Sequence, residues 1–229
     1  MTSRRDRRRL GPLDVVGVFV PGIRRVRAQK EPFAAAWRTA NDEALRGGAP
    51  LWVALGDSMT QGIGAPDFTR GWVGQAHARL ATTGHHLGVV NLSVTGARIE
   101  DVVTEQLPRL LALPSAPMLV TVLVGANDML SRTRRLEAPD RFAALLAALP
   151  AGKSVVATLP QGNPQALAVN TLIDHAAATG ALHVADFRGP ALGPIRGTLA
   201  DDWFHPNERG YARIASLFEV PIRRALRAA

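Results

Sequence analysis

Residues 51–62 read LWVALGDSMTQG, a run of five apolar residues that leads directly into Gly56, Asp57 and Ser58. The apolar run is typical of a short buried strand, and Gly56 permits the tight bend that a strand-to-helix turn needs. A helix that starts at such a turn directs its free backbone N–H groups towards the turn. The stretch therefore predicts a strand, a turn and a helix, with the hydroxyl of Ser58 at the turn.

Four further apolar runs have the same character as residues 51–55, and helical patterns separate them. The runs are residues 88–94, 118–124, 153–159 and 181–187, and the helical stretches are residues 32–46, 72–83, 99–111, 139–149, 164–179 and 207–219. Short apolar strands that alternate with amphipathic helices are typical of a parallel sheet covered by helices on both faces. The sequence therefore predicts a single α/β domain with a five-stranded parallel sheet.

The charge of the chain is concentrated at its beginning. The formal net charge is +8, and residues 1–30 account for +7 of it, with eight Arg and Lys30 against Asp6 and Asp14. The rest of the chain is nearly neutral, which disfavours specific nucleic-acid binding by the whole protein. We expect a basic, flexible N-terminal arm at residues 1–30 and a globular domain at residues 31–229. The arm is either simply solvated or makes a weak contact with anionic lipid or another acidic surface.

The start of the chain has a cationic stretch followed by apolar residues, as a secretory signal peptide does. Its apolar part is interrupted by Pro12, Asp14 and Pro21, and no small-residue cleavage pattern follows before Arg24. We therefore expect a cytoplasmic protein, which the basic arm can bring to a membrane surface, rather than an exported one. The chain contains no Cys, which excludes a thiol nucleophile and a Cys-based zinc site.

Polar residues follow the expected strands, whose carboxyl ends meet at one edge of the sheet. Ser58 follows the first strand, Gly96 the second and Asn127 the third, and the loop after the last strand contains Asp202 and His205. Acyl transfer needs a nucleophile, a base, a group that orients the base and donors for an oxyanion. These five residues can supply the parts together, although each of them alone is also common in loops and caps.

Asp202 and His205 are three residues apart, a spacing at which a carboxylate and an imidazole on a turn can face each other. Asp202 could then bind one ring nitrogen and leave the other for Ser58. Pro206 follows the histidine and suits the first position of a helix. Asp201 is the competing partner, but its spacing of four residues and its place further into the loop make it the second choice.

Four segments resemble the sequence blocks of the SGNH (GDSL-like) hydrolase family. They are GDSMTQG (56–62), NLSVTG (91–96), GAND (125–128) and DWFHPNERGY (202–211), and together they cover the chain from about residue 51 to about residue 215. The resemblance implies a flavodoxin-like three-layer α/β/α fold and the activity of an esterase, lipase or related acylhydrolase. No G-x-S-x-G motif occurs in the chain, which disfavours the ordinary α/β-hydrolase fold.

The resemblance also implies roles for individual residues. Ser58 corresponds to the nucleophile, His205 to the base and Asp202 to the residue that orients the base. The oxyanion hole would be made by the backbone N–H groups of Ser58 and Gly96 and by the side-chain amide of Asn127.

The sequence departs from the family pattern at two positions. Met59 stands where Leu is frequent, and Ser93 stands where many members have Gly. Hydrolysis by these residues needs no metal and no organic cofactor, so we expect neither. His85 and His86 are adjacent but have no carboxylate partner in the sequence pattern, which makes them a poor metal site.

Two groups of residues near these segments are weaker candidates for substrate binding. Asp67, Arg70 and Trp72 lie in the loop that leaves the nucleophile turn, where they either line a pocket or, for Trp72, pack the helix that follows. Arg132 follows Asn127 closely and either faces solvent or attracts anionic substrates.

These observations together predict a serine hydrolase that cleaves carboxylic esters through an acyl-enzyme on Ser58. Its expected substrates are esters of short or medium acyl chains, or lysophospholipid-like molecules. One alternative is a carbohydrate O-acetyl esterase, since the same fold serves sugar esters. Another, from a different class, is a catalytically idle domain that the basic arm tethers to an acidic surface.

Overall fold

A parallel five-stranded sheet lies at the centre of the computed structural model, which describes residues 20–193 and 195–228. The strands are β1 (Leu51–Gly56), β2 (Gly88–Asn91), β3 (Leu119–Leu123), β4 (Ser154–Ala157) and β5 (His183–Ala185). Their order in the sheet is β2-β1-β3-β4-β5, and all four pairs are parallel. This is the flavodoxin-like strand order, so the predicted fold class and the five-stranded parallel sheet are confirmed.

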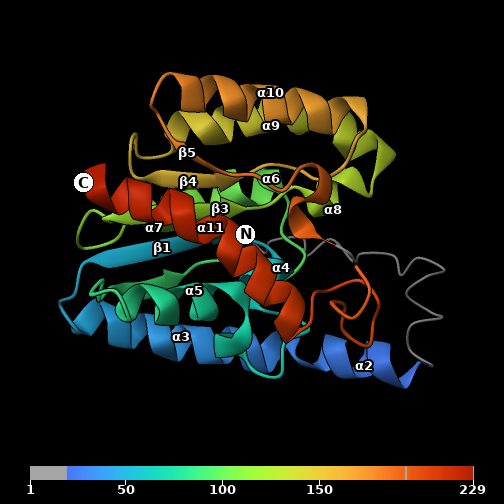
Figure 1. Ribbon diagram of the computed structural model, residues 1–229, viewed down its shortest axis with the longest axis horizontal. Coiled ribbons are helices and arrows are strands. Elements are labelled where there is room, and N and C mark those ends of the chain that lie inside the picture. Colours follow the sequence, from blue (N-terminus) through green and yellow to red (C-terminus); the bar gives the residue numbers. More distant parts are fainter. Residues whose placement is uncertain (1–19, 194, 229) are drawn as a thin grey trace, which may run out of the picture.

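Helices cover both faces of the sheet (Figure 1). The longer ones are α3 (Lys30–Arg46), α5 (Trp72–Ala81), α9 (Arg132–Ala148), α10 (Pro164–Ala178) and α11 (Glu208–Ala228). The shorter segments are α2 (Pro21–Ala28), α4 (Ser58–Gln61), η1 (Phe68–Arg70), α6 (Ile99–Asp101), η2 (Val102–Gln106), α7 (Leu107–Leu111), α8 (Ala126–Met129) and η3 (Gly189–Leu192). The apolar clusters place α5 and α11 on one face of the sheet and α7, α9 and α10 on the other, while α3 packs beside the edge strand β2.

Strand β1 shows why the strands appear in the sequence as continuous apolar runs. Val53 and Leu55 belong to the core on the α9 and α10 side. Trp52 and Ala54 belong to the core on the α5 and α11 side. Trp52 is fully buried and donates its indole N–H to the hydroxyl of Thr121 on β3 at 2.9 Å. Because successive side chains point to opposite faces, a strand that is buried on both faces needs apolar residues at every position.

The helix expected over residues 99–111 is divided into α6, η2 and α7, and η2 is π-helical. Its last residue, Gln106, reaches the end of β1. The Oε1 atom of Gln106 accepts the N–H of Gly56 and the Nε2 atom donates to the Gly56 carbonyl, both at 2.8 Å. The π-helical turn therefore directs an amide at the end of β1, and such turns are frequent near functional sites.

Two other helices exceed the predicted bounds, and both contain proline. α9 begins at Arg132 rather than near residue 139 and runs through Pro139. α11 runs through Pro221 and continues well beyond residue 219. A proline removes one helical hydrogen bond, but the buried faces of both helices supply most of their stability. Phe142 of α9 and Phe218 of α11 are fully buried in the two cores.

The N-terminal arm predicted for residues 1–30 is only partly described. Residues 1–19 lie outside the described residues, whereas residues 21–28 form α2. Val26 of α2 is buried in a small apolar cluster whose other buried members are Phe33, Ile63 and Ala200. Residues 21–28 are therefore helical and packed, and the division of the chain at residue 30 stays a prediction.

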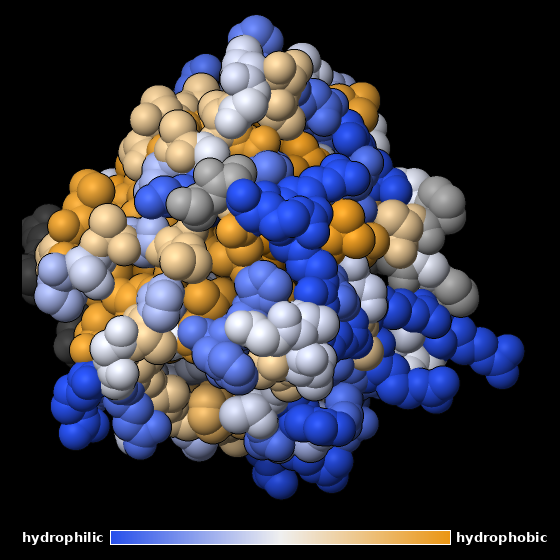
Figure 2. Space-filling model, turned by 60° about the vertical axis from the view of Figure 1, so that its left-hand side comes forward, coloured by the Kyte–Doolittle hydropathy of each residue, from blue (hydrophilic) through white to orange (hydrophobic). Residues whose placement is uncertain are grey.

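One face of the molecule has a surface of mixed hydropathy (Figure 2). On the face shown in Figure 2, apolar (orange) and hydrophilic (blue) side chains are interspersed rather than divided into two halves. No helix within the described ranges 20–193 and 195–228 is long and apolar enough to cross a membrane.

Replacing Gln106 by Leu should lower the free energy of unfolding by about 1 to 3 kcal/mol, because the N–H of Gly56 then stays buried without a partner, while its carbonyl keeps the hydrogen bond from the Val94 N–H at 3.2 Å. Urea-induced unfolding, followed by tryptophan fluorescence, measures this change. The control is Thr104→Ala, at an exposed position of the same segment, which should change stability by less than about 0.5 kcal/mol. A Gln106→Leu variant as stable as the wild type would contradict the bracing of Gly56.

Candidate active site

Ser58 lies at the start of α4, directly beyond the end of β1. Gly56 has a φ of 150°, and a Cβ there would overlap the carbonyl oxygen of Leu123 on β3, so the bend requires glycine. Asp57 caps α4, because its Oδ1 accepts the N–H of Met59 at 2.9 Å. The Ser58 side chain is therefore held at a helix N-terminus, and the residue is only 5% exposed.

Ser58, His205 and Asp202 form one chain of hydrogen bonds. His205 Nε2 lies 2.9 Å from Ser58 Oγ, and His205 Nδ1 lies 2.5 Å from Asp202 Oδ2. Asp202 can only accept a hydrogen bond when it is ionised, which assigns the proton of the neutral imidazole to Nδ1. Nε2 is then free to accept the hydroxyl proton of Ser58. The structure brings together the three residues that the sequence pattern had selected.

The second oxygen of Asp202 holds the turn that carries the histidine. Asp202 Oδ1 accepts the N–H groups of Phe204 and His205, at 3.1 and 3.0 Å. Burial alone would raise the pKa of Asp202, but the hydrogen bonds from the His205 ring and from these N–H groups outweigh it and lower the pKa. Trp203 adopts a φ of 55°, a left-handed conformation that is unfavourable for a bulky residue and that the turn imposes. Asp202 is therefore charged and oriented.

Asp201, the second choice for the partner of His205, points elsewhere. Its carboxylate pairs with Arg25 of α2 at 2.6 Å, and both side chains are more than half exposed. The imidazole contact therefore belongs to Asp202, as the spacing of three residues favoured.

Asn127 and Gly96 lie on neighbouring loops beside the nucleophile turn. Asn127 Nδ2 donates to the carbonyl of Ala97, the residue after Gly96, at 2.9 Å. The same nitrogen lies 3.5 Å from Asp57 Oδ2, next to Ser58. Gly96 has a φ of 82°, which glycine adopts without strain. The Asn127 amide therefore lies between the loop that carries Gly96 and the N-terminus of α4.

Two buried side-chain amides fix the loop that carries Gly96. Gln61 accepts the N–H of Thr95 at its Oε1, at 3.0 Å. Asn91 donates from Nδ2 to the carbonyl of Thr60 at 2.8 Å. Because Thr60 and Gln61 both belong to α4, the Gly96 loop is fastened to the helix that carries the nucleophile.

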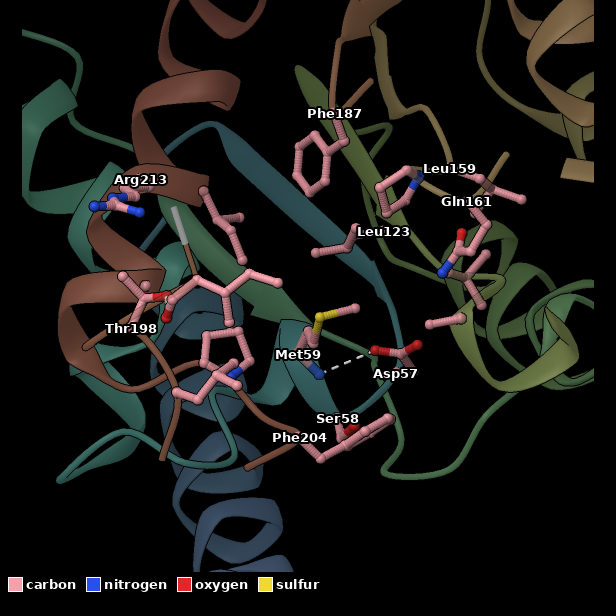
Figure 3. A pocket seen from close by; sticks show the side chains of 18 of the residues that line it. Asp57, Ser58, Met59, Leu123, Leu159, Gln161, Phe187, Thr198, Phe204 and Arg213 are labelled. Atoms are coloured by element: carbon pink, nitrogen blue, oxygen red, sulfur yellow. Dashed lines mark hydrogen bonds between the residues drawn. The ribbon is translucent and has the colours of Figure 1, made fainter. Parts of the chain in front are cut away.

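A cavity of about 380 Å³ opens beside Ser58 (Figure 3). Asp57 and Ser58 lie at one end of it, and Phe187 and Leu159 lie at the other. Most of its lining is apolar and comes from the ends of β3, β4 and β5, the loop before His205, and α11; it includes Leu123, Val124, Ile195, Leu199 and Ile214. The Oε1 atom of Gln161 is buried there and accepts no hydrogen bond from the described residues. The cavity therefore offers mainly apolar contacts next to the nucleophile.

Comparison with known families decides the class of this protein. The model of the GDSL-like lipase/acylhydrolase family matches residues 54–213, which is more than half of the chain. The chain belongs to this family. It is a GDSL-type esterase or acylhydrolase, and the matched segment contains every residue of the hydrogen-bonded chain while leaving α2 and α3 outside.

Three relatives of this GDSL-type hydrolase illustrate the similarity. Esterase TesA from Pseudomonas aeruginosa strain PAO1 is 27% identical over 164 residues, which cover 69% of this chain and 80% of TesA. A crystal structure of a protein named TesA has a TM-score of 0.64 at 23% identity, over 77% of this chain and 99% of the crystallised chain. Esterase EstA from Pseudoalteromonas sp. has a TM-score of 0.58 at 19% identity, over 77% of this chain and 98% of EstA. A family 3 carbohydrate esterase from Clostridium thermocellum has a TM-score of 0.57 at 17% identity, over 78% of this chain and 98% of that esterase.

The four weaker candidates for substrate binding lie away from the cavity beside Ser58. Trp72 is fully buried and stacks on Phe218 with ring centroids 4.0 Å apart, so it packs the core. Asp67 caps η1 by accepting the N–H of Thr69 at 2.8 Å. The remaining two candidates are also outside the cavity: Arg70 forms an ion pair with Glu208, and Arg132 is exposed at the start of α9.

The sequence motifs indicated only part of the cavity lining, such as Ser58 and Asn127. Phe187, Thr198 and Ile214 also line the cavity and come from three separate segments outside the motifs. The sequence around each of them looks like that of an ordinary core or loop segment. Only the fold brings them to Ser58. Among the described residues, no group of three or more His, Asp or Glu side chains is placed to hold a metal ion.

Asp57 is a buried carboxyl beside the nucleophile, only 1% exposed. Burial raises its pKa from an ordinary 3.8 to about 7, although the hydrogen bond from the Met59 N–H and the nearby His205 act in the opposite direction. Asp128, a second buried carboxyl close by, raises it further. The folded protein therefore binds the Asp57 proton more tightly than the unfolded chain does.

Replacing Asp57 by Asn should flatten the pH dependence of stability. A carboxyl whose pKa is raised by folding stabilises the folded state fully below its unfolded pKa, and this contribution is lost as the pH rises through the folded value. Between about pH 4 and about pH 8, the wild type should lose about 4 kcal/mol of unfolding free energy relative to Asp57→Asn. Urea unfolding at several pH values measures the difference.

The exposed Asp140 provides the control for this measurement, because Asp140→Asn should follow the wild-type pH profile. Parallel profiles for the wild type and Asp57→Asn would show that Asp57 does not change its protonation in this range.

Proposed function

We propose that the protein hydrolyses carboxylic esters through a covalent acyl-enzyme intermediate on Ser58. The observation that carries the proposal is the chain of hydrogen bonds from Ser58 through His205 to Asp202, at 2.9 and 2.5 Å, at one end of an apolar cavity. Nucleophile, base and orienting carboxylate recur in this relation on several unrelated folds that perform acyl transfer. The completeness of the chain favours catalysis over the idle domain considered above.

In the first half-reaction, Ser58 Oγ attacks the carbonyl carbon of the ester while His205 Nε2 takes the hydroxyl proton. The carbonyl oxygen becomes an oxyanion, which accepts hydrogen bonds from the N–H groups of Ser58 and Gly96 and from the amide of Asn127. When the C–O bond to the alcohol breaks, His205 returns its proton to the leaving oxygen. The acyl group stays on Ser58.

In the second half-reaction, water attacks the acyl-enzyme and gives its proton to His205. The bond between the acyl carbon and Ser58 Oγ breaks, and the imidazolium returns the proton to the serine. The carboxylic acid leaves the cavity. Asp202 stabilises the imidazolium that forms in both halves, because its pKa is lowered and it stays ionised.

The shape and chemistry of the cavity support short or medium acyl chains as the substrate class. Its volume of about 380 Å³ is near the lower end of the range for ligand pockets. Its mostly apolar lining suits the acyl chain of a simple ester or of a lysophospholipid-like molecule. A carbohydrate O-acetyl esterase would need more hydrogen-bonding groups around the sugar hydroxyls, so the lining supports this alternative less. The contact of the basic arm with anionic lipid also stays a proposal.

Hydrolysis of p-nitrophenyl esters, from acetate to palmitate, tests the proposal. We expect turnover to be highest for short and medium chains and to fall for palmitate, which exceeds the cavity. Ser58→Ala should lower kcat by several orders of magnitude, up to about 10⁶-fold. The matched control is Ser115→Ala, at an exposed serine, which should leave kcat unchanged. A Ser58→Ala variant that hydrolyses the esters at the wild-type rate would contradict the acyl-enzyme proposal.

Asn127→Ala should lower kcat by about 10²- to 10³-fold with a small change in KM, because the lost amide serves the oxyanion rather than the bound ester. Steady-state kinetics with the best ester measure both constants, and circular dichroism establishes that the variant is folded. Equal turnover in Asn127→Ala would remove this residue from the oxyanion hole.

A further inference from the structure

Gln29, between α2 and α3, holds the loop that follows α4. Its Oε1 accepts the N–H of Gly64 and its Nε2 donates to the carbonyl of Ala65, both at 2.8 Å. One side-chain amide therefore satisfies two backbone groups of the loop, as a neighbouring strand would. Gln29 precedes residues 54–213, so it lies outside the segment that the family shares.

The loop held by Gln29 lies between the nucleophile and the base. The Ile63 N–H donates to the carbonyl of Ser58 at 3.0 Å, so the loop continues directly from α4. A Cβ on Gly64 would lie 2.9 Å from His205 Cβ and 2.5 Å from the carbonyl oxygen of Pro206. A backbone packed this closely cannot shift without moving the histidine or opening a gap. The loop therefore lies against both the helix that carries Ser58 and the backbone that carries His205.

Helix α2 contacts the histidine loop as well. A Cβ on Gly22 would lie 2.6 Å from the carbonyl oxygen of Asp201, and Arg25 pairs with the Asp201 carboxylate at 2.6 Å. The ion pair is exposed and contributes little by itself. Val26 is buried and packs against Ala200 in the same small cluster. The segment from Gly22 to Gln29 therefore touches both loops, the one after the serine and the one before the histidine.

We propose that Gln29 is a positioning residue for ester hydrolysis, which acts through Gly64 to hold His205 at hydrogen-bond distance from Ser58. Gln29 touches neither the serine nor the histidine and takes no part in the chemistry. The inference rests on the proposed function, because it assigns Gln29 a role in base catalysis by His205. A misplacement of about 1 Å can lower a catalysed rate about 100-fold, so a small shift of the loop is enough.

The test compares Gln29→Leu with the wild type in the full chain, with p-nitrophenyl butyrate as substrate. Leu is similar in size but makes neither hydrogen bond. We expect kcat to fall about 10- to 100-fold while KM changes less than about 2-fold, because Gln29 does not line the cavity. Gln29→Glu keeps the acceptor for the Gly64 N–H and loses the donor to the Ala65 carbonyl. Its kcat should therefore lie between that of the wild type and that of Gln29→Leu. The control is the exposed Arg24→Ala on α2, with unchanged kcat.

The decisive readout is the same substitution in a His205→Ala background, where the residual hydrolysis no longer uses the base. Gln29→Leu should there have almost no further effect, since it acts through His205. A merely structural role would lower the rate by the same factor in both backgrounds. That result, or an unchanged kcat in Gln29→Leu, would overturn the inference. If Gln29→Leu does not fold, Gln29→Glu is measured in both backgrounds by the same criterion.

Failure of this inference and failure of the proposed function give different results. A wild type that is inactive on the esters, or whose hydrolysis survives Ser58→Ala, overturns the proposed function and the role of Gln29 with it. A wild type with Ser58-dependent hydrolysis that Gln29→Leu leaves intact overturns the role of Gln29 alone.

Discussion

The approach of β1 to β3 leaves no room for a side chain at Gly56, because a Cβ there would overlap the carbonyl oxygen of Leu123. From the other side, Gln106 binds both the N–H and the carbonyl of the same glycine. The end of β1 is therefore held in place from two sides. The next residue, Asp57, caps the N-terminus of α4, which begins at Ser58. The position of Ser58 follows from this crowding, and the remaining parts of the site are arranged around it.

Two carboxyl groups near Ser58 have pKa values shifted in opposite directions, and the cause is local in each case. Asp202 receives hydrogen bonds from the His205 ring and two backbone N–H groups, which together outweigh its burial. Asp57 receives one such bond and a long contact from Asn127, so burial prevails and raises its pKa to about 7. A charged Asp57 would oppose negative charge on a substrate oxygen beside Ser58, whereas the neutral form does not. The environments therefore keep Asp202 charged and let Asp57 hold its proton to a higher pH than an ordinary aspartic acid does.

The strands and the polar residues at their ends could be predicted because each leaves a local pattern in the sequence. Apolar runs mark strands buried on both faces, and the spacing of Asp202 and His205 is that of one turn. The amides of Gln29, Gln61 and Gln106 could not be predicted, because each binds a backbone group more than 30 residues away. A glutamine in such a segment has the same local pattern whether it faces solvent or braces a loop. The catalytic roles themselves stay predictions until activity is measured.

His205 differs from Ser58 in that no strand ends beside it, since a long loop separates it from β5. Hydrogen bonds within that loop, such as the one from the Ala200 N–H to the His205 carbonyl at 2.8 Å, fix its shape. These hydrogen bonds do not fix the distance between His205 and Ser58, because the donor and the acceptor of each bond belong to the same loop and move together when the loop moves. That distance depends on contacts with other segments, and the backbone at Gly64 is one of these. The segment shared with the family supplies the reacting groups, while the helices before it hold the two halves of the site together. A chain with the same motifs but without these helices would need different contacts to place its histidine.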